Sequence, residues 1–275
     1  MNCLVTGAQG FLGNQVVLAL RSAGVMVAAT GRRPTANVDV CDLTSASDVR
    51  RLVGVIKPDY IIHCAAHVPK KLAEYQDECN AKESLYMIEM ILQASDCPLV
   101  FISSMTVYGT ERDRPVVEED AGDPASAYGC GKWQAEQRLK VEARPTLAIR
   151  IPGLFGPSRQ SGLVYNLMHG IKYNYGYTLP QTATLWAAMH VNDAATSIAK
   201  LALSGIQGFE TINLAYRGNY SIESLVSTVG SIYARHIDYN VMQPSFEFDL
   251  TRADARGAVP NGSFRDALVK FRDEI

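Results

Sequence analysis

The feature that most constrains the fold is a glycine-rich turn between an apolar run and an amphipathic segment near the N-terminus. The apolar run is Asn2–Thr6, and the turn after it reads Gly-Ala-Gln-Gly-Phe-Leu-Gly over residues 7–13. Residues 14–22 have the spacing of an amphipathic helix, and Val25–Thr30 reads as a second buried strand. A strand, a tight turn, a helix and a second strand within about 30 residues form a dinucleotide-binding unit. The pattern predicts an α/β fold with a parallel sheet.

Each glycine of this turn has a distinct predicted role. Gly7 makes the tight turn, Gly10 lets the backbone approach a pyrophosphate, and Gly13 allows the helix to pack closely on the strand. The pyrophosphate is expected over the helix N-terminus, where free amides and the helix dipole favour anions. The alternative is a plain glycine turn that holds no ligand.

The end of the second strand indicates which dinucleotide the unit binds. An acidic residue there holds the ribose hydroxyls of NAD. Here that position is Gly31, followed by Arg32 and Arg33. An acid would repel a 2′-phosphate, whereas a guanidinium binds it in fork geometry. We therefore predict NADP(H), with NAD(H) as the alternative if these arginines are only solvated loop charges.

Composition sets the class of protein and its partners. The chain has 275 residues, 47% hydrophobic and 20% charged, which is typical of a globular domain. A net charge of -2 predicts no nucleic-acid partner. The six cysteines form no C-x-x-C pair, so we expect no metal site and no disulfide framework, but the reduced thiols of a cytosol. No apolar run reaches transmembrane length, and the first strand begins at once, so we expect no membrane partner, no signal peptide and a cytoplasmic location.

A second motif, Tyr128-Gly-Cys-Gly-Lys132, carries the candidate acid–base chemistry. On a helix, residues four apart share one face. An ammonium beside a phenol favours the phenolate, so Lys132 is expected to lower the pKa of Tyr128 and to make it a proton donor and acceptor. By itself, a tyrosine four residues before a lysine is weak evidence for a catalytic site, because chance matches on exposed helix turns are common. It gains weight from the stretch Ser103-Ser104-Met105-Thr106-Val107-Tyr108-Gly109 upstream of it.

The glycine turn, the serine stretch and the tyrosine–lysine motif together resemble the extended short-chain dehydrogenase/reductase family, over nearly the whole chain. That family includes nucleotide-sugar epimerases, dehydratases and ketoreductases. The resemblance implies a Rossmann-type doubly wound parallel sheet with a smaller C-terminal substrate-binding α/β portion. It also implies a catalytic role for Ser104, which orients the substrate oxygen near Tyr128, and ribose contacts for Lys132. Members commonly form homodimers through the helix of Tyr128 and the helix before it.

The resemblance also implies cofactor contacts beyond the three glycines and the two arginines. In the turn these are Gln9, Phe11 and Leu12. Asp42 stands at the position that contacts the adenine edge, although an aspartate there also suits a helix cap before residues 45–56. The other implied positions are Leu43, Ala65, Ala66 and Asn80, the last on a long helix expected over residues 71–95.

Several positions depart from the family pattern and narrow the reaction. Sugar dehydratases carry Asp-Glu after the catalytic serine or threonine, where this chain has Met105 and Thr106. Epimerase-reductases carry a cysteine where Thr106 stands and a later histidine, for which the matching region here holds Ser161-Gly162. Trp186 stands where nucleotide-sugar enzymes use an arginine for the diphosphate.

Four cations elsewhere in the chain are candidates to replace that arginine: Arg159, Lys172, Arg217 and Arg252. His67, just after a buried strand, is a further candidate to touch substrate, although a lone loop histidine more often has no role. With Thr106, Arg159 and Trp186 it completes the set of candidate substrate contacts.

We expect residues 1–157 to form the cofactor domain with the catalytic set, and residues 158–275 to be mainly substrate-binding, with about 188–205 returning to the first domain. The predicted function is that of an NADPH-dependent ketoreductase acting on a nucleotide-linked 4-keto-6-deoxy sugar. The alternatives are an NAD-dependent nucleotide-sugar 4-epimerase, an enzyme acting on a small ketone or aldehyde, and a non-catalytic NADP(H)-binding regulator.

Overall fold

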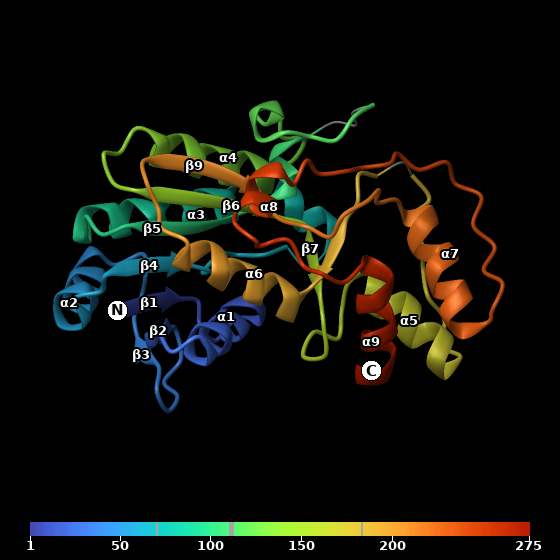
Figure 1. Ribbon diagram of the computed structural model, residues 1–275, viewed down its shortest axis with the longest axis horizontal. Coiled ribbons are helices and arrows are strands. Elements are labelled where there is room, and N and C mark those ends of the chain that lie inside the picture. The colour runs from blue at the N-terminus through green and yellow to red at the C-terminus, as the bar shows by residue number, and fades with distance from the viewer. Residues whose placement is uncertain (70, 110–112, 183) are drawn as a thin grey trace.

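A computed structural model describes residues 1–69, 71–109, 113–182 and 184–275 (Figure 1). Residues 70, 110–112 and 183 lie outside the described residues.

A parallel seven-stranded sheet forms the centre of the described structure, with strand order β3-β2-β1-β4-β5-β6-β9. The strands are β1 Asn2–Thr6, β2 Met26–Gly31, β3 Asp39–Val40, β4 Tyr60–His63, β5 Leu99–Ser104, β6 Thr146–Ile151 and β9 Phe209–Asn213. Every adjacent pair is parallel, and the order turns back at β1, where β2 lies on one side and β4 on the other. Ligands of open α/β sheets bind outside the carboxyl ends of the strands at such a switch point. The predicted doubly wound parallel fold is confirmed.

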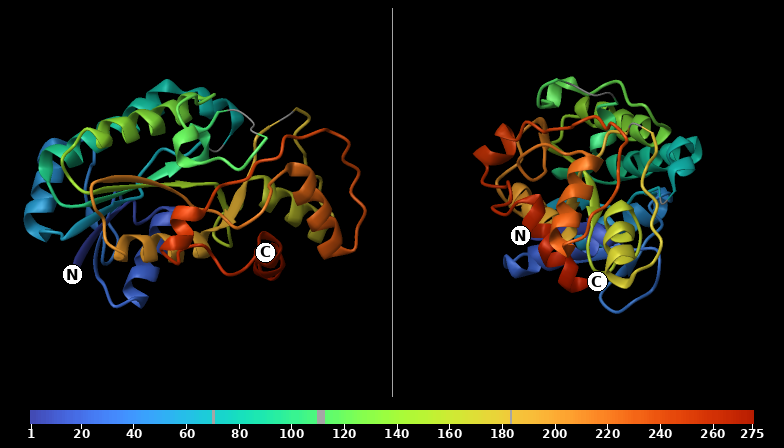
Figure 2. Two further views of the ribbon diagram at one scale, coloured as in Figure 1. Left: turned by 45° about the horizontal axis from the view of Figure 1, so that its top comes forward. Right: turned by 90° about the vertical axis from the view of Figure 1, so that its right-hand side faces the viewer.

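Helices cover both faces of this sheet (Figure 2). On one face α1 Phe11–Ser22 packs against α6 Val191–Leu203. On the other lie α2 Ala46–Ile56, α3 Glu78–Ala94 and α4 Ala127–Lys140, with α3 in contact with both neighbours. Because both faces are covered, β4, β5 and β6 are buried along their whole lengths.

The helix predicted over residues 71–95 is shorter than expected. A 3₁₀ helix, η1 Leu72–Gln76, precedes α3, and Asp77 separates the two. The Asp77 carboxylate accepts hydrogen bonds from the amides of Cys79 at 2.9 Å and Asn80 at 3.3 Å. This N-cap makes α3 begin at Glu78.

The C-terminal half adds a second group of elements beyond the sheet, on the right of Figure 1. They are β7 Gly153–Phe155, α5 Leu163–Tyr173, β8 Ala188–His190, α7 Ile222–Tyr233 and α9 Phe264–Glu274. β7 pairs in parallel with β8, α7 contacts α5 and α9, and α9 contacts β8.

Part of the C-terminal half returns to the sheet. α6 packs on α1, within the range predicted to return. In addition, β9 pairs with β6 as the seventh strand, and α8 Thr251–Ala255 packs on β9. The division of the chain near residue 157 stays a prediction.

Candidate active site

The glycine-rich turn has the geometry needed to hold a pyrophosphate. Gly7 has φ +66°, and a Cβ built on it would lie 2.6 Å from the Ala65 amide nitrogen. A Cβ on Gly13 would lie 2.2 Å from the Gly7 carbonyl oxygen. Gly10 is the N-cap of α1 and supplies no side chain to bond the first amides of the helix. The turn is therefore a bare-backbone cradle at a helix N-terminus, which fits a dinucleotide phosphate.

The loop after β2 is tied to this turn by Gln9. Its side-chain amide donates to the Arg33 carbonyl at 2.6 Å and to the Thr35 hydroxyl at 3.2 Å, and its carbonyl accepts from the Arg33 amide at 3.1 Å. The same side chain fills the space beside Gly31, where an added Cβ would lie 2.4 Å from its oxygen. Gln9 thus fixes the backbone from which the exposed side chains of Arg32 and Arg33 project.

Asp42 lies near this loop and does not cap α2. Its carboxylate accepts from the Thr44 amide at 2.9 Å and the Thr44 hydroxyl at 2.7 Å. These bonds, helped by the charge of Arg32, lower the pKa of Asp42. Ser45 is the N-cap of α2, so the helix-cap alternative for Asp42 is wrong.

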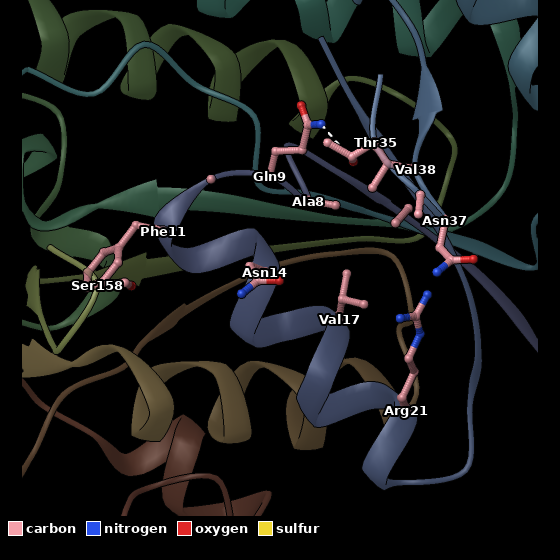
Figure 3. A pocket seen from close by; sticks show the side chains of 13 residues that line it. Ala8, Gln9, Phe11, Asn14, Val17, Arg21, Thr35, Asn37, Val38 and Ser158 are labelled. Carbon is pink, nitrogen blue, oxygen red and sulfur yellow. Dashed lines mark hydrogen bonds between the residues drawn. The ribbon is translucent and has the colours of Figure 1, made fainter. Parts of the chain in front are cut away.

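A cavity of about 490 Å³ adjoins the turn (Figure 3). It runs along α1 from Gly10 and Phe11 to Arg21, and Thr35 and Asn37 form its other side. The cavity therefore joins the turn to the loop that follows β2.

The remaining predicted cofactor positions divide between backbone and packing roles. Ala65 and Ala66 follow β4, and the amide of Ala65 donates to the Thr6 hydroxyl at 3.4 Å. Leu43 is buried in one hydrophobic cluster, and the partly buried Leu12 packs against another. Asn80 lies in the first turn of α3, where its side-chain amide donates to Asp77 at 2.8 Å.

The candidate catalytic residues come from β5 and α4. Ser104 ends β5, and its hydroxyl oxygen accepts from the Thr106 amide at 3.2 Å and from the Thr106 hydroxyl at 3.0 Å. The first turn of α4 approaches this loop closely, because a Cβ on Gly129 would lie 2.5 Å from the Thr106 carbonyl oxygen. Tyr128 is the residue before that glycine, so the fold brings it beside the serine loop.

Lys132 lies one turn further along α4 and is almost fully buried. Its ammonium donates to the Ile102 carbonyl at 2.8 Å and lies 5.9 Å from the centre of the Tyr128 ring. It also lies 4.8 Å from the centre of the Phe101 ring. The predicted shared face of Tyr128 and Lys132 is confirmed by this geometry.

Burial governs the protonation of both groups. Burial lowers the pKa of Lys132 to about 8. The ring of Tyr128 keeps some exposed surface, but the surrounding protein excludes enough water to raise the pKa of its phenol. The predicted lowering of this pKa is wrong for this structure, because desolvation outweighs the charge of Arg159, which acts to lower it. Tyr128 is therefore a protonated phenol at neutral pH and is suited to donate a proton.

Tyr75 is a site residue that no sequence motif indicated. Its ring packs edge-on against Tyr128, with 5.7 Å between ring centres and an interplanar angle of 82°. Next to it, the Gln76 side chain bonds the Ala125 carbonyl and the Ala127 amide, each at 3.4 Å. Since η1 and α4 are far apart in the chain, only folding brings these rings together.

Of the candidate substrate contacts, Thr106 bonds Ser104 and Arg159 acts electrostatically on Tyr128. The Arg159 guanidinium stacks 5.8 Å from the centre of the Phe11 ring, and its charge acts to lower the pKa of both Tyr75 and Tyr128. Trp186 instead packs against Phe264 at 5.8 Å in the C-terminal group.

The other candidates are committed or exposed. Lys172 donates to backbone carbonyls at the C-terminus, Arg217 pairs with Asp254 at 2.6 Å, and Arg252 bonds Glu119. His67 is exposed in the loop after β4. Arg159 also donates hydrogen bonds, to the Leu154 carbonyl and the Ser161 hydroxyl, each at 3.4 Å. It is nevertheless the cation of these four whose charge acts on Tyr128, so it is the best placed to meet an anionic substrate there.

The described part of the chain offers neither a metal site nor a membrane span. Within its ranges, no group of three or more histidine, cysteine or acidic side chains is arranged to hold a metal ion. Within the same ranges, no helix is long and apolar enough to cross a membrane.

The sheet, the glycine cradle and the Ser104, Tyr128 and Lys132 set define a dinucleotide-dependent enzyme of the short-chain dehydrogenase/reductase class. A family model described as the RmlD substrate binding domain matches residues 1–174. The chain belongs to that family, within the extended short-chain dehydrogenases/reductases.

Sequence relatives agree with this placement. A UDP-glucose 4-epimerase from Caenorhabditis elegans is 27% identical, covering 89% of this chain and 86% of the relative. A probable dTDP-4,6-dihydroxy-2-methyloxan-3-one 4-ketoreductase from Streptomyces antibioticus is 28% identical over 165 residues, which cover 58% of this chain and 54% of the relative.

Solved structures share the fold. The UDP-glucose 4-epimerase of Thermus thermophilus, solved in complex with NAD, matches with a TM-score of 0.83 at 22% identity. The match covers 100% of this chain and 98% of that structure. Family and fold thus indicate an oxidoreductase or epimerase type of enzyme.

Proposed function

We propose that this protein is an NADPH-dependent ketoreductase that reduces a nucleotide-linked 4-keto-6-deoxy sugar. The observation that carries the proposal is the protonated phenol of Tyr128 beside Ser104 and Lys132. One proton donor matches one hydride transfer to a carbonyl. The bound nicotinamide would supply that hydride.

The side chains have complementary tasks in this reaction. Ser104 accepts two hydrogen bonds from Thr106, which leaves its own hydroxyl hydrogen to donate to the substrate carbonyl oxygen. Tyr128 donates a proton to the alkoxide that forms, and the Lys132 ammonium stabilises the resulting phenolate. Tyr75 forms an aromatic wall beside this centre and keeps water from it.

The arginines after β2 support NADPH over NADH. Arg32 and Arg33 are exposed at the end of the strand, and Gly31 provides no acid to repel a 2′-phosphate. Gln9 holds their backbone in place. NADPH is the usual cellular reductant, which agrees with net reduction.

The substrate class rests on the relatives and on Arg159. The relatives named above act on nucleotide-linked sugars, or are named for a dTDP-linked ketone. Arg159 lies near the catalytic tyrosine and supplies one cation for a diphosphate. Dehydration is not part of the proposal, because Met105 and Thr106 offer no acid to expel a hydroxyl.

A nucleotide-sugar 4-epimerase is the second candidate. It is favoured by the UDP-glucose 4-epimerases, whose matches at 24–27% identity span most of their length. It uses the same catalytic set but retains its cofactor, so no net reduction occurs.

We also propose that the protein is cytoplasmic and forms a homodimer. Sedimentation equilibrium tests the dimer.

The deciding experiment mixes the protein with NADPH and a panel of nucleotide-linked 4-keto-6-deoxy sugars and follows the absorbance of the reduced nicotinamide. Stoichiometric consumption with one keto sugar supports the reductase. Interconversion of two 4-hydroxy epimers, with bound cofactor and no net consumption, would make the protein an epimerase.

A further inference from the structure

A buried ion pair lies directly behind the catalytic helix and strand. Glu136 on α4 is fully buried, and Arg150 on β6 is 1% exposed. The guanidinium donates through Nε to Oε1 of Glu136 at 3.0 Å and through Nη2 to Oε2 at 2.6 Å. The Ser103 hydroxyl also donates to Oε1. Ser103 and Arg150 are directly opposite each other on β5 and β6, so the carboxylate of α4 bridges two strands.

This bridge continues a pattern of contacts between α4 and β5. Lys132 and Glu136 are successive turns on one face of α4, because residues four apart lie above one another. Lys132 bonds the carbonyl of Ile102, and Glu136 bonds the side chain of Ser103. The next residue of the strand is Ser104. Two consecutive strand residues thus hold two consecutive helix turns.

The guanidinium also links the bridge to the rest of the sheet. Arg150 donates through Nη1 to the Glu118 carbonyl at 2.6 Å and to the Tyr108 hydroxyl at 3.1 Å. Tyr108 in turn donates to the Asn213 side chain on β9. A buried pair held by this many bonds has its charges well satisfied, so loss of one partner would leave the other charge uncompensated.

We propose that Glu136 is a positioning residue for the catalytic centre: through Ser103 and Arg150 it holds α4 against β5, and its charge keeps the Lys132 ammonium protonated. The expected effects on kcat and kcat/KM rest on the proposed function, whereas the effect of Glu136 on Lys132 does not. Glu136 acts through Lys132 and Ser104 and touches no reacting atom.

The charged and titratable groups that face Lys132 come from two elements. His63 and Cys64, at the end of β4, interact with it electrostatically, and Tyr128 and Glu136 lie on α4 itself. Burial holds the imidazole of His63 neutral with a pKa of about 3, and it raises the pKa of Cys64 to about 12. Of these four groups, Glu136 is the carboxylate, and it is held in an ion pair with Arg150.

The test titrates Lys132 directly, without a substrate. Lysine labelled with ¹³C at the ε carbon is incorporated, the Lys132 signal is assigned by its absence in Lys132→Gln, and its chemical shift is followed with pH. In Glu136→Gln the midpoint of the Lys132 titration should fall by about one pH unit, as expected for loss of a charge one helix turn away. The matched control is Glu89→Gln, which breaks a carboxylate–guanidinium pair to Arg138 between α3 and α4, at 2.6 Å and away from the site. The midpoint there should not move.

Kinetics separate the two parts of the role. In Glu136→Gln the basic limb of kcat/KM should move with the Lys132 midpoint. Ser103→Ala removes one hydrogen bond and no charge, so it should lower kcat by about tenfold, as expected for about 1.4 kcal/mol of lost transition-state stabilisation, with the midpoint unchanged. If Glu136→Gln does not fold, Glu136→Gln/Arg150→Met removes both charges together, and the same titration applies.

A folded Glu136→Gln protein with an unmoved Lys132 midpoint overturns the proposal, as does an equal shift in Glu89→Gln. If the midpoint moves as expected but no keto sugar is reduced, the proposed function fails and the role of Glu136 toward Lys132 stands.

Discussion

The glycine-rich turn allows a stability prediction in which alanine at Gly13 is compared with alanine at a second helical glycine, Gly54, as a control. Gly13 and Gly54 both lie within helices, so alanine in place of either gains about 0.8–1.0 kcal/mol of helix propensity. Their surroundings differ. A Cβ on Gly13 would meet the Gly7 carbonyl oxygen at 2.2 Å and its carbon at 2.8 Å, whereas a Cβ on Gly54 meets nothing within 4 Å. The difference between the two variants therefore isolates the close approach of α1 to the turn.

The loss of stability expected in Gly13→Ala depends on which atoms the new methyl group would meet. The contacts of Gly13 are backbone atoms, and they must move by roughly 1 Å to accept a methyl group, a strain of about 1–3 kcal/mol. Gly54→Ala should be more stable than the wild type by up to about 1 kcal/mol. The free energy of unfolding of Gly13→Ala should be about 1–3 kcal/mol smaller than that of Gly54→Ala. At about 2–4 °C per kcal/mol this is a difference of roughly 2–12 °C in Tm.

The same displacement should weaken cofactor binding. The Gly7 carbonyl belongs to the turn that holds the pyrophosphate, so moving it misplaces the amides at the N-terminus of α1. We expect the Kd for NADPH to rise at least about tenfold in Gly13→Ala, or about 1.4 kcal/mol, and to stay unchanged in Gly54→Ala. Circular dichroism melting and isothermal titration calorimetry measure the two effects. A Gly13→Ala protein that melts with Gly54→Ala and binds NADPH like the wild type would refute the reasoning.

Three further predictions concern charge and protonation. Arg32→Ala should weaken NADPH binding by about tenfold or more and leave NADH nearly unchanged, since a charge-assisted bond to a 2′-phosphate contributes about 1.5–3 kcal/mol; equal affinity of the wild type for both cofactors would contradict it. Tyr128→Phe should retain NADPH affinity and lose about 10²–10⁴-fold in turnover, measured by single-turnover absorbance, because only the proton donor is removed; near-normal turnover would make the tyrosine structural. For pH dependence, Lys132 loses its proton as pH rises through its lowered pKa of about 8, so kcat/KM for reduction should be level at neutral pH and fall above about 8; a profile that is flat to pH 10 would show that the ammonium is not required.

Local sequence was sufficient to predict the cofactor unit. The glycines of the first turn, the apolar strands around it and the four-residue spacing of Tyr128 and Lys132 all depend on contacts close in the chain or on helix geometry. Residues 14–22 were predicted as an amphipathic helix and lie within α1 Phe11–Ser22. Such features are determined by dihedral preference and periodicity, which the sequence carries directly.

Dihedral preference and periodicity did not predict the pKa values of the site's side chains. The Tyr128–Lys132 spacing predicted a lowered phenol pKa, but the structure raises it, because desolvation depends on every segment packed around the ring. Tyr75 comes to the site from a 3₁₀ helix with no motif of its own. Its place is set by folding alone.

Tertiary structure also decided which cations are available. Arg159 and Arg252 were both candidates in the sequence to replace the missing arginine. The fold ties Arg252 to Glu119 and stacks Arg159 on Phe11 near the catalytic tyrosine. Glu136, too, reads as an ordinary helix residue until β5 and β6 bring Ser103 and Arg150 to its carboxylate. The sequence alone determined the helices, the strands and the types of the candidate catalytic residues, because these follow from local spacing. The partners, the burial and the pKa values of the site's side chains required the structure. They depend on contacts between segments that only the folded chain brings together.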